Sequence, residues 1–433
     1  MDDSDGNSSR SSSKNNNSSK SRILDLVLKH EGYRSSRCIN LIASENITSH
    51  AVRVLLASDL MHRYSLRMFA DGNFYRGTRY IEQVVEYADA LAMELFNARY
   101  ADTRAISGHV CSLAVLMCLS KSNDTIMALS MDDGGYPGYM SKYMPSRLML
   151  EMHSIPYDQA NMCIDVDACI AEIQELRPRL VIIAPSTITF HTPLQGIAKA
   201  CSDVGSMLVY DASHVLGLIA GHAFSNPLHE GASILIGSTH KSFPGPQGGV
   251  ILADRDDGYG LEDYMPLRVI DNPHFNRIAA LALALEEMRE YGRDYAMQVV
   301  KNARALARAL DDNGVEVRKR AMDGQYTETH QVLLKHKYKD KFVKMLEDAN
   351  IIVDSMLRLG TCEVTRRGMK EEEMGHIAEM ISSIYHAVDG SNNNNTASID
   401  QMEVTNKIRR DVEDLASKFN SIDYSSSIFS LLT

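Results

Sequence analysis

A lysine directly after a short apolar run is the strongest starting candidate for a catalytic residue in this chain. The run at residues 234–236 predicts a buried strand, and Thr239, His240 and Lys241 follow it. Glycines and prolines at 244–249 then predict a tight loop. Partial burial in such a loop lowers the pKa of an amine and makes it nucleophilic, as a Schiff-base lysine requires. Most lysines are solvated, however, so the pattern alone also fits a surface loop.

A second apolar run ends in a carboxylate. Residues 207–221 read MLVYDASHVLGLIAG and place Asp211, Ser213 and His214 after a predicted strand. Open α/β sheets bind ligands at the carboxyl ends of their parallel strands, so this cluster and Lys241 are expected to meet. A carboxylate opposite a lysine-linked cofactor favours pyridoxal 5'-phosphate (PLP), whose ring nitrogen it would pair with. His214 could pack beside the ring or orient it.

Four motifs in fixed order carry a family resemblance. They are LIASENITS at 41–49, DASHVLGLIAG at 211–221, GSTHKSFPGPQGG at 237–249 and LRLGTCEVTRRG at 357–368. With them the chain resembles serine hydroxymethyltransferase, and more closely its archaeal-type members, over about residues 23–388. The resemblance implies a homodimeric PLP-dependent enzyme of fold type I. Such an enzyme interconverts serine and glycine and transfers the one-carbon unit to a reduced pterin.

The resemblance also implies roles for individual residues. Arg358 matches the arginine that clamps the substrate carboxylate, and its planar fork suits that task. Ser44 would also lie near the substrate. The residues implied in catalysis are Lys241, Tyr64, Tyr75 and His240, the two tyrosines acting partly across the dimer. Those implied in cofactor binding are Ser107, Gly108, His109, Tyr136, Ser186, Asp211, His214 and Lys241; no metal site is implied.

The expected phosphate site lies where a helix begins. Residues 106–119 read as a loop opening into an apolar helix with Ser107 at its start. Free N–H groups and the helix dipole at that end can bind a phosphate, although an ordinary serine N-cap gives the same pattern. The resemblance at Ser107 and Gly108 favours the phosphate site.

Three departures or variations bear on the reaction. Leu66 stands where the resemblance implies a glutamate, and Asp71 or Glu45 could supply a carboxylate in its place. Tyr136 replaces a histidine and could still stack on the cofactor. The short segment before Arg358 resembles the archaeal type, which implies a modified pterin such as tetrahydromethanopterin in place of ordinary folate.

Two other functions stay open at this point. Loss of the glutamate at position 66 favours a pterin-independent β-hydroxy-amino-acid aldolase or a transaldolase of the same fold. A non-catalytic PLP-fold protein is the third alternative. The joint presence of Lys241, Asp211 and Arg358 argues against that third alternative.

The elements that must position these residues follow from periodicity. Strands alternate with helices up to Lys241, which predicts an α/β fold with a mainly parallel, doubly wound sheet. Long helical patterns at 275–291 and 293–313, and a strand-like stretch at 314–318, lead into a smaller α+β domain. We expect a disordered tail at 1–21, an N-terminal arm at 22–60 with a helix at 49–60, and a large PLP-binding domain at 61–275. A small C-terminal domain at 276–389, a linker at 390–398 and a C-terminal helix at 399–433 complete the prediction.

Composition limits the classes of partner. The formal net charge is −11, so general affinity for nucleic acid or an anionic membrane is not expected. No apolar run could span a bilayer and no signal-peptide core is present, which predicts a cytoplasmic protein. The expected partners are serine, glycine, a reduced pterin and a second copy of the chain.

Overall fold

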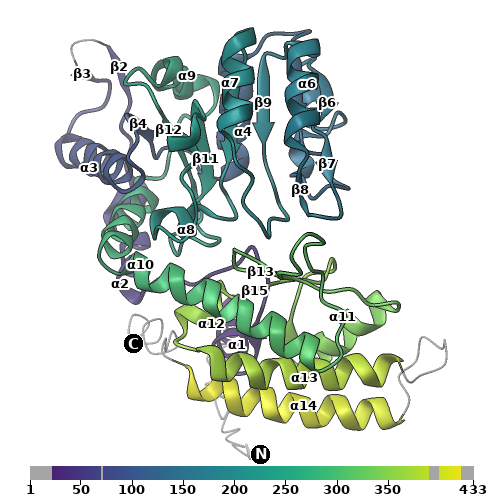
Figure 1. Cartoon of the computed structure of the whole chain (residues 1–433). Helices are drawn as coiled ribbons and strands as arrows, with labels where there is room; N and C mark the ends of the chain where they lie inside the picture. The colour runs from purple at the N-terminus through teal and green to yellow at the C-terminus, as the bar shows by residue number, and fades with distance from the viewer. Residues whose placement is uncertain (1–21, 70–71, 390–398, 421–433) are drawn as a thin grey trace, which may run out of the picture.

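The core of the molecule is a seven-stranded sheet in the order β4-β12-β11-β10-β9-β5-β6 (Figure 1). This computed structural model describes residues 22–69, 72–389 and 399–420. Strand β12 is antiparallel to both of its neighbours, and the other pairs are parallel, so the predicted mainly parallel sheet is confirmed. The strands are β4 (Tyr100–Asp102), β5 (Thr125–Ala128), β6 (Glu151–Ser154), β9 (Leu180–Ile183), β10 (Met207–Asp211), β11 (Ile234–Ser238) and β12 (Gly249–Ala253).

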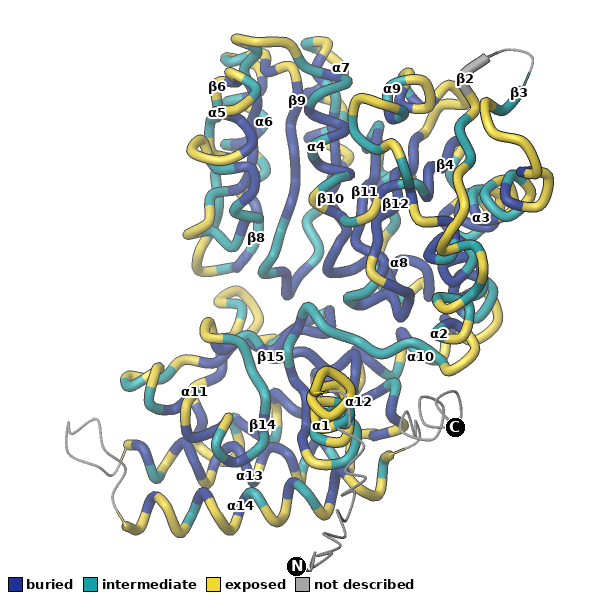
Figure 2. The backbone as a smooth tube through the Cα atoms, turned by 180° about the vertical axis from the view of Figure 1, so that it is seen from behind, coloured by how far each residue is buried: buried dark blue, intermediate teal, exposed yellow. Residues whose placement is uncertain are grey.

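Helices cover both faces of this sheet. Along β9, Leu180 and Ile182 join one apolar cluster while Val181 and Ile183 join another, so each face has its own core. Figure 2 shows β9, β11 and β12 in the colour of buried residues. One face packs on α4 (Gly108–Leu119), α5 (Met144–Arg147) and α9 (Leu261–Arg268). The other packs on α2 (His50–Leu56), α3 (Arg79–Phe96), α6 (Val166–Leu176), α7 (Gln195–Val204), α8 (Leu216–Ala220) and part of α10 (Phe275–Asp312).

Helix α10 is a single helix of 38 residues that runs from the sheet domain into the C-terminal region (Figure 1). The prediction of two helices, at 275–291 and 293–313, is therefore wrong. Gly292 does not end the helix, because a single glycine inside a helix costs only about 0.5–1 kcal/mol relative to alanine. The first half of α10 belongs to the core of the sheet domain, and Leu306 and Leu310 belong to the C-terminal core.

The C-terminal core combines segments from both ends of the chain. Strand β13 (Gln331–Leu333) pairs with β15 (Arg358–Gly360), and β1 (Ile39–Asn40) pairs with β14 (Ile351–Ile352). The expected strand at 314–318 is absent; there Val317 forms only an isolated bridge to Leu334. The remaining helices of this region are α1 (Arg22–Ser36), α11 (Lys339–Asp348), α12 (Cys362–Arg366), α13 (Glu371–Asp389) and α14 (Ile399–Lys418).

Two smaller differences concern the N-terminal half. The helix expected at 49–60 ends at Leu56 and is followed by a 3-10 turn, η1 (Asp59–His62). The segment that follows contains a short hairpin, β2 (Arg67–Phe69) with β3 (Gly72–Asn73), which was not predicted from the sequence. A second hairpin joins β7 (Tyr157–Asp158) to β8 (Cys163–Ile164). The predicted tail, the linker and residues 421–433 lie outside the described residues.

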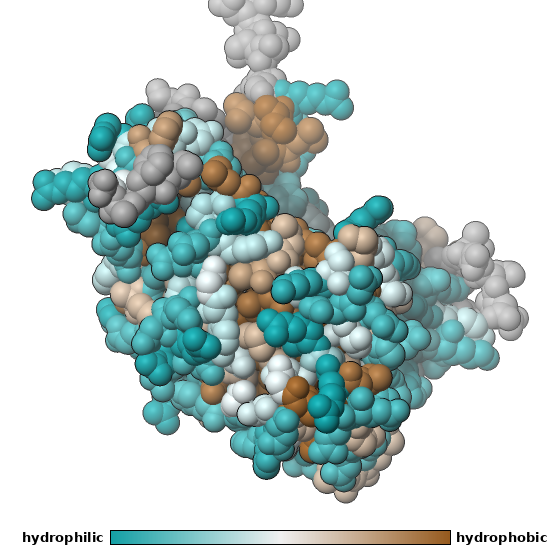
Figure 3. Space-filling model, turned by 90° about the horizontal axis from the view of Figure 1, so that it is seen from above, coloured by the Kyte–Doolittle hydropathy of each residue, from teal (hydrophilic) through white to brown (hydrophobic). Residues whose placement is uncertain are grey.

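The surface gives no sign of a membrane span in the part of the chain that is described. Figure 3 shows a mainly hydrophilic face with scattered hydrophobic side chains. No helix among the described residues is long and apolar enough to cross a bilayer.

Candidate active site

Side chains from several strand ends meet in one cavity at the carboxyl edge of the sheet. Tyr136 follows β5, Ser186 follows β9, Asp211 ends β10 and Lys241 follows β11. This is the convergence that parallel strands impose on residues at their carboxyl ends. The cavity is lined by Gly108, His109, Tyr136, Ala184, Pro185, Ser186, Asp211, Ser213, His214, Ser238 and Lys241.

Lys241 sits in a loop whose shape is fixed by hydrogen bonds. The hydroxyl of Thr239 donates to the carbonyl of Pro246 at 2.7 Å, which closes the turn that follows the lysine. Burial lowers the pKa of Lys241; the carboxylate of Asp211 acts in the opposite direction, and the charge of Arg358 lowers the pKa further. A larger fraction of the amine is therefore unprotonated than for a solvated lysine, as nucleophilic attack requires.

Asp211 is a buried carboxylate whose nearest cation is Lys241. The N–H of Ser213 donates to its Oδ1 at 2.9 Å. Burial raises the pKa of Asp211, while the charge of Lys241 and the hydrogen bonds from Ser213 lower it. This carboxylate can therefore pair with a cationic ring nitrogen that enters the cavity.

The first turn of α4 closes another wall of the cavity. The Oγ of Ser107 caps the helix by accepting from the N–H of Val110 at 3.2 Å. A Cβ at Gly108 would lie only 2.3 Å from the Oγ of Ser238, so glycine allows α4 to approach the end of β11. The positive end of the helix dipole thus faces the cavity, where a phosphate would be stabilised.

Tyr136 and His109 form the polar rim beside that turn. The Tyr136 hydroxyl lies 2.9 Å from His109 Nδ1, and the ring of Tyr136 packs over Gly138, where a Cβ would lie 2.5 Å from its Cε1. Burial, then the negative charge of Asp211, raises the pKa of Tyr136, so its phenol stays neutral. Its role in stacking on a cofactor stays a prediction.

Arg358 reaches the cavity from the C-terminal region. It opens β15, its Nη1 donates to the carbonyl of Ser186, and its Nε lies 3.1 Å from Oδ2 of Asp354. Because Ser186 lines the cavity, the contact with its carbonyl places the guanidinium beside the cavity. An arginine held in this way can bind a carboxylate with the rest of its fork.

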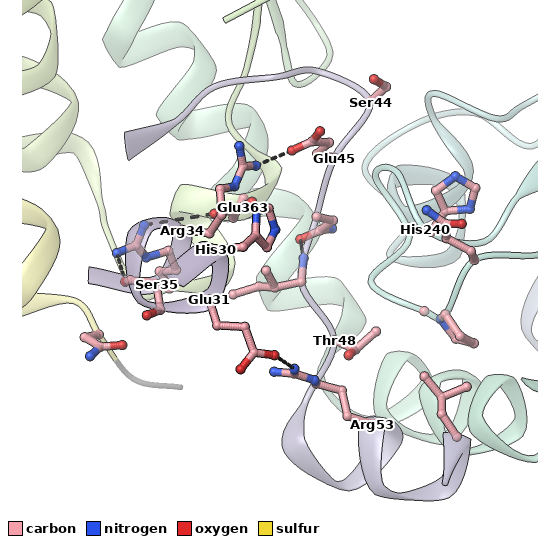
Figure 4. A pocket seen from close by; sticks show the side chains of 18 of the residues that line it. His30, Glu31, Arg34, Ser35, Ser44, Glu45, Thr48, Arg53, His240 and Glu363 are labelled. Atoms are coloured by element: carbon pink, nitrogen blue, oxygen red, sulfur yellow. Dashed lines mark hydrogen bonds and ion pairs between the residues drawn. The ribbon is translucent and has the colours of Figure 1, made fainter. Parts of the chain in front are cut away.

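Figure 4 shows a second cavity, of about 690 Å³, which is lined by His240, the residue before Lys241. Ser44, Glu45 and His240 line this second cavity and are absent from the lining of the first. The carboxylate of Glu45 accepts hydrogen bonds from Arg34 and, at 2.9 Å, from the amide of Asn40. The substrate role expected for Ser44 and the catalytic role expected for His240 stay predictions.

The two predicted catalytic tyrosines lie away from both cavities in their own chain. Tyr64 and Tyr75 are 48% and 38% exposed, with ring centroids 5.4 Å apart. Leu66 lines a third cavity of about 770 Å³ near β4 and α9, and Asp71 lies outside the described residues. Within one chain, therefore, neither tyrosine is brought to Lys241.

Sequence reasoning missed two buried polar residues at the start of β13. His330 stacks on His214 with ring centroids 6.1 Å apart, and Gln331 Nε2 lies 3.2 Å from His214 Nδ1. Both side chains are fully buried. The available signal was a polar pair, His-Gln, directly before the apolar residues 332–334.

The residues of the first cavity fit PLP. Lys241 provides the amine, Asp211 a carboxylate for the ring nitrogen, and the first turn of α4 a phosphate site. The absence of a side chain at Gly108 leaves that turn close to the strand end. The donor set and its arrangement therefore match the charges of this cofactor.

Comparisons with known proteins agree with this geometry. The family model for serine hydroxymethyltransferase matches residues 17–381. The chain belongs to the serine hydroxymethyltransferase family. The serine hydroxymethyltransferase of Methanocaldococcus jannaschii is 40% identical over 93% of this chain and 95% of its own. That of Methanopyrus kandleri is 36% identical over 93% and 94%.

A solved structure shares the whole fold. The L-threonine transaldolase from Pseudomonas fluorescens in its internal aldimine state aligns with a TM-score of 0.80 and 26% identity. The alignment covers 94% of this chain and 96% of that one. The predicted PLP-dependent fold type I, the PLP cofactor and membership of the hydroxymethyltransferases are confirmed.

Proposed function

We propose that this protein interconverts serine and glycine and transfers the one-carbon unit to a reduced pterin, of the tetrahydrofolate or tetrahydromethanopterin type. The observation that carries the proposal is that Lys241 and Asp211 line one cavity, while Arg358 binds the carbonyl of Ser186, another residue of its lining. Each supplies a different requirement: an amine, a carboxylate for a ring nitrogen, and a cation for the substrate carboxylate. The family relatives support the same activity.

The residues of the cavity divide the work as follows. PLP, when bound, takes up the negative charge that develops at the α-carbon of the amino acid. Lys241 supplies the amine that holds the cofactor, and Asp211 keeps the ring nitrogen protonated. Arg358 binds the α-carboxylate and thereby orients the bond to be broken. Tyr136 and the first turn of α4 line the cavity that would hold the cofactor.

The protein is proposed to act as a homodimer in the cytoplasm. Tyr64 and Tyr75 belong to a segment that exposes aromatic rings, including Phe74 at 60% exposure. Single exposed aromatic residues are common, but a group of them on one segment marks an interaction surface. A second copy of the chain would cover these rings and bring the tyrosines to its Lys241 cavity.

A transaldolase or aldolase is the second candidate function. The structural match to the L-threonine transaldolase and the leucine at position 66 both favour it. Such an enzyme cleaves or exchanges a β-hydroxy amino acid without a pterin. Because Leu66 offers neither a proton nor a hydrogen bond, the pterin-dependent step is where the two functions separate.

One experiment tests the proposal. Glycine formation from serine by the PLP-loaded protein is measured without a pterin, with tetrahydrofolate and with tetrahydromethanopterin. The proposal expects one of the two pterins to accelerate the reaction strongly. Equal rates in all three conditions, with rapid cleavage of threonine, would instead establish the aldolase or transaldolase.

A further inference from the structure

Gln331 links two parts of the candidate active site through a single buried amide. Its Oε1 accepts from the N–H of Ile188 at 2.9 Å. Its Nε2 donates to the carbonyl of Ser186 at 3.1 Å and lies 3.2 Å from His214 Nδ1. The same Ser186 carbonyl accepts from Arg358. One side chain thus contacts both the histidine beside Lys241 and the carbonyl that holds the substrate-binding arginine.

The two backbone contacts fix which way the amide points. A backbone N–H can only donate, so the atom facing Ile188 must be the amide oxygen. A backbone carbonyl can only accept, so the atom facing Ser186 must be the amide nitrogen. The reversed amide would place two donors against each other and two acceptors against each other. The orientation of Gln331 therefore follows from its neighbours.

This orientation places the proton on His214. The amide nitrogen of Gln331 can only donate hydrogen bonds, so His214 Nδ1 must be the acceptor in this contact. In a neutral imidazole the proton then lies on Nε2. His214 Nε2 is 3.5 Å from the Nζ of Lys241, so the N–H of the ring faces the reactive nitrogen.

The charges around His214 keep the ring neutral. Burial lowers its pKa most, and the cations Lys241 and Arg358, followed by His330, lower it further, while the carbonyl of Ala43 acts in the opposite direction. His330, which stacks on the ring at an interplanar angle of 10°, is itself held neutral, since burial lowers its pKa to about 4. A neutral His214 has one ring proton, and its position is a matter of tautomer alone.

We propose that Gln331 is a positioning residue that holds His214 in the Nε2–H tautomer and so presents an N–H to the nitrogen of Lys241. A ring N–H at this position can donate a hydrogen bond to the lone pair of the neutral Lys241 amine. The ammonium form has no lone pair to accept that hydrogen bond, so the contact favours the neutral amine. Through the Ser186 carbonyl, the same amide also supports the position of Arg358. The inference rests on the proposed function only in taking Lys241 as the reactive amine.

The position of the ring proton can be read directly. The ¹⁵N spectrum of the PLP-loaded protein with ¹⁵N-labelled histidine distinguishes protonated from unprotonated ring nitrogens, and His214→Asn assigns the signals. We expect a single Nε2–H tautomer in the wild type. In Gln331→Met, which keeps the length of the side chain but has no donor, we expect that single tautomer to be lost. A protonated Nδ1 in the wild type would overturn the proposal, as would an unchanged Nε2–H tautomer in Gln331→Met.

A matched control separates positioning from mere loosening of the junction. The Thr327 hydroxyl donates to the carbonyl of Thr189 at 3.3 Å in the same junction, and among the described contacts no hydrogen bond joins it to Gln331, His214 or Arg358. Thr327→Val should keep the tautomer of His214. Loss of the tautomer in this variant would show that the junction, not Gln331, sets the proton, and would overturn the proposal.

Activity should fall in the variant that loses the tautomer and stay close to wild type in the control. Residues that orient a functional histidine typically contribute about 10–100-fold, by analogy with those that orient metal-bound histidines. We expect kcat/KM for serine to fall by about that factor in Gln331→Met and much less in Thr327→Val. Because the tautomer is read without any substrate, it tests Gln331 even if the protein uses a different amino acid or no pterin.

Discussion

Arg358 is the residue whose contribution can be isolated most cleanly. Its Nη1 and Nε already bind the Ser186 carbonyl and Asp354, so its orientation is set before substrate arrives. Losing a charge partner of this kind typically costs about 2–5 kcal/mol. Arg358→Ala should therefore raise KM for serine by about 30-fold or more, at roughly tenfold per 1.4 kcal/mol, while PLP stays bound. Steady-state kinetics and cofactor absorbance measure the two effects, and an unchanged KM would remove Arg358 from the substrate site.

Leu66 calls for a replacement carboxylate in the pterin-dependent step. Glu45 is the described candidate, since Arg34 and Asn40 hold its side chain beside Ser44. General acid–base help is typically worth about 10²–10⁴-fold in rate, so Glu45→Gln should slow pterin-dependent transfer by about that factor. Glu31→Gln is the matched control, because Glu31 lines the same cavity and pairs with Arg53. Leu66→Glu should be neutral or harmful.

Two outcomes would contradict this account of position 66. If Leu66→Glu accelerates pterin-dependent exchange, the leucine itself limits that step and pterin-independent cleavage dominates in the wild type. If the wild type is fast with a pterin and Glu45→Gln is equally fast, the proton comes from elsewhere. Asp71, which lies outside the described residues, and Tyr75 or Tyr136 would then be tested in turn.

The placement of site residues at strand ends could be predicted, because it follows from the local sequence pattern alone. Asp211 and Lys241 each follow an apolar run, and a parallel sheet must bring such ends together. Gln331 could not be predicted in the same way. Its partners, Ile188, Ser186 and His214, lie more than a hundred residues away in sequence and meet it only after the C-terminal region docks.

At the scale of elements, the contact between α8 and α10 gives the sharpest test. A Cβ on Gly221 would lie 2.3 Å from the Gly292 carbonyl oxygen and 2.4 Å from the Cβ of Ala296. Overpacking of this kind typically costs about 1–3 kcal/mol, so Gly221→Ala should lower the free energy of unfolding by about that amount. The measurement is urea unfolding of the full chain.

A second glycine provides a control, for which we expect the free energy of unfolding to rise instead of fall. Gly375 lies inside α13, and an added Cβ there would meet no atom within 4 Å. Gly375→Ala should raise the free energy of unfolding by about 0.5–1 kcal/mol, because alanine loses less backbone entropy in a helix. If both substitutions destabilise the protein equally, the close approach at Gly221 is not the cause.

Helix α10 also corrects an error of sequence reasoning. A glycine at position 292, in the sequence EYGRD, indicated a break between two helices, yet α10 passes through it without interruption. Met288 and Ala296, on either side of this glycine, are buried in the core of the sheet domain, and their packing outweighs the cost of one glycine. Local propensity cannot reveal how strongly tertiary packing supports a helix.

At the scale of the whole molecule, the account requires two chains. Tyr64 and Tyr75 are exposed and line neither the Lys241 cavity nor the second cavity. One chain therefore does not bring the predicted catalytic tyrosines to Lys241. We expect an active preparation to show a mass near twice that of one chain, 48.2 kDa, in sedimentation or light scattering. Full activity at the mass of a single chain would rule out the shared site.

The assignment of the active site depends on which lysine carries the cofactor. Lys241 is the lysine whose burial, whose partner Asp211 and whose cavity together suit it to hold PLP. Borohydride reduction of the PLP-loaded protein, followed by peptide mapping, should place the trapped cofactor on Lys241, and Lys241→Ala should show no trapped adduct. A trapped cofactor on any other lysine of the wild type would contradict the account.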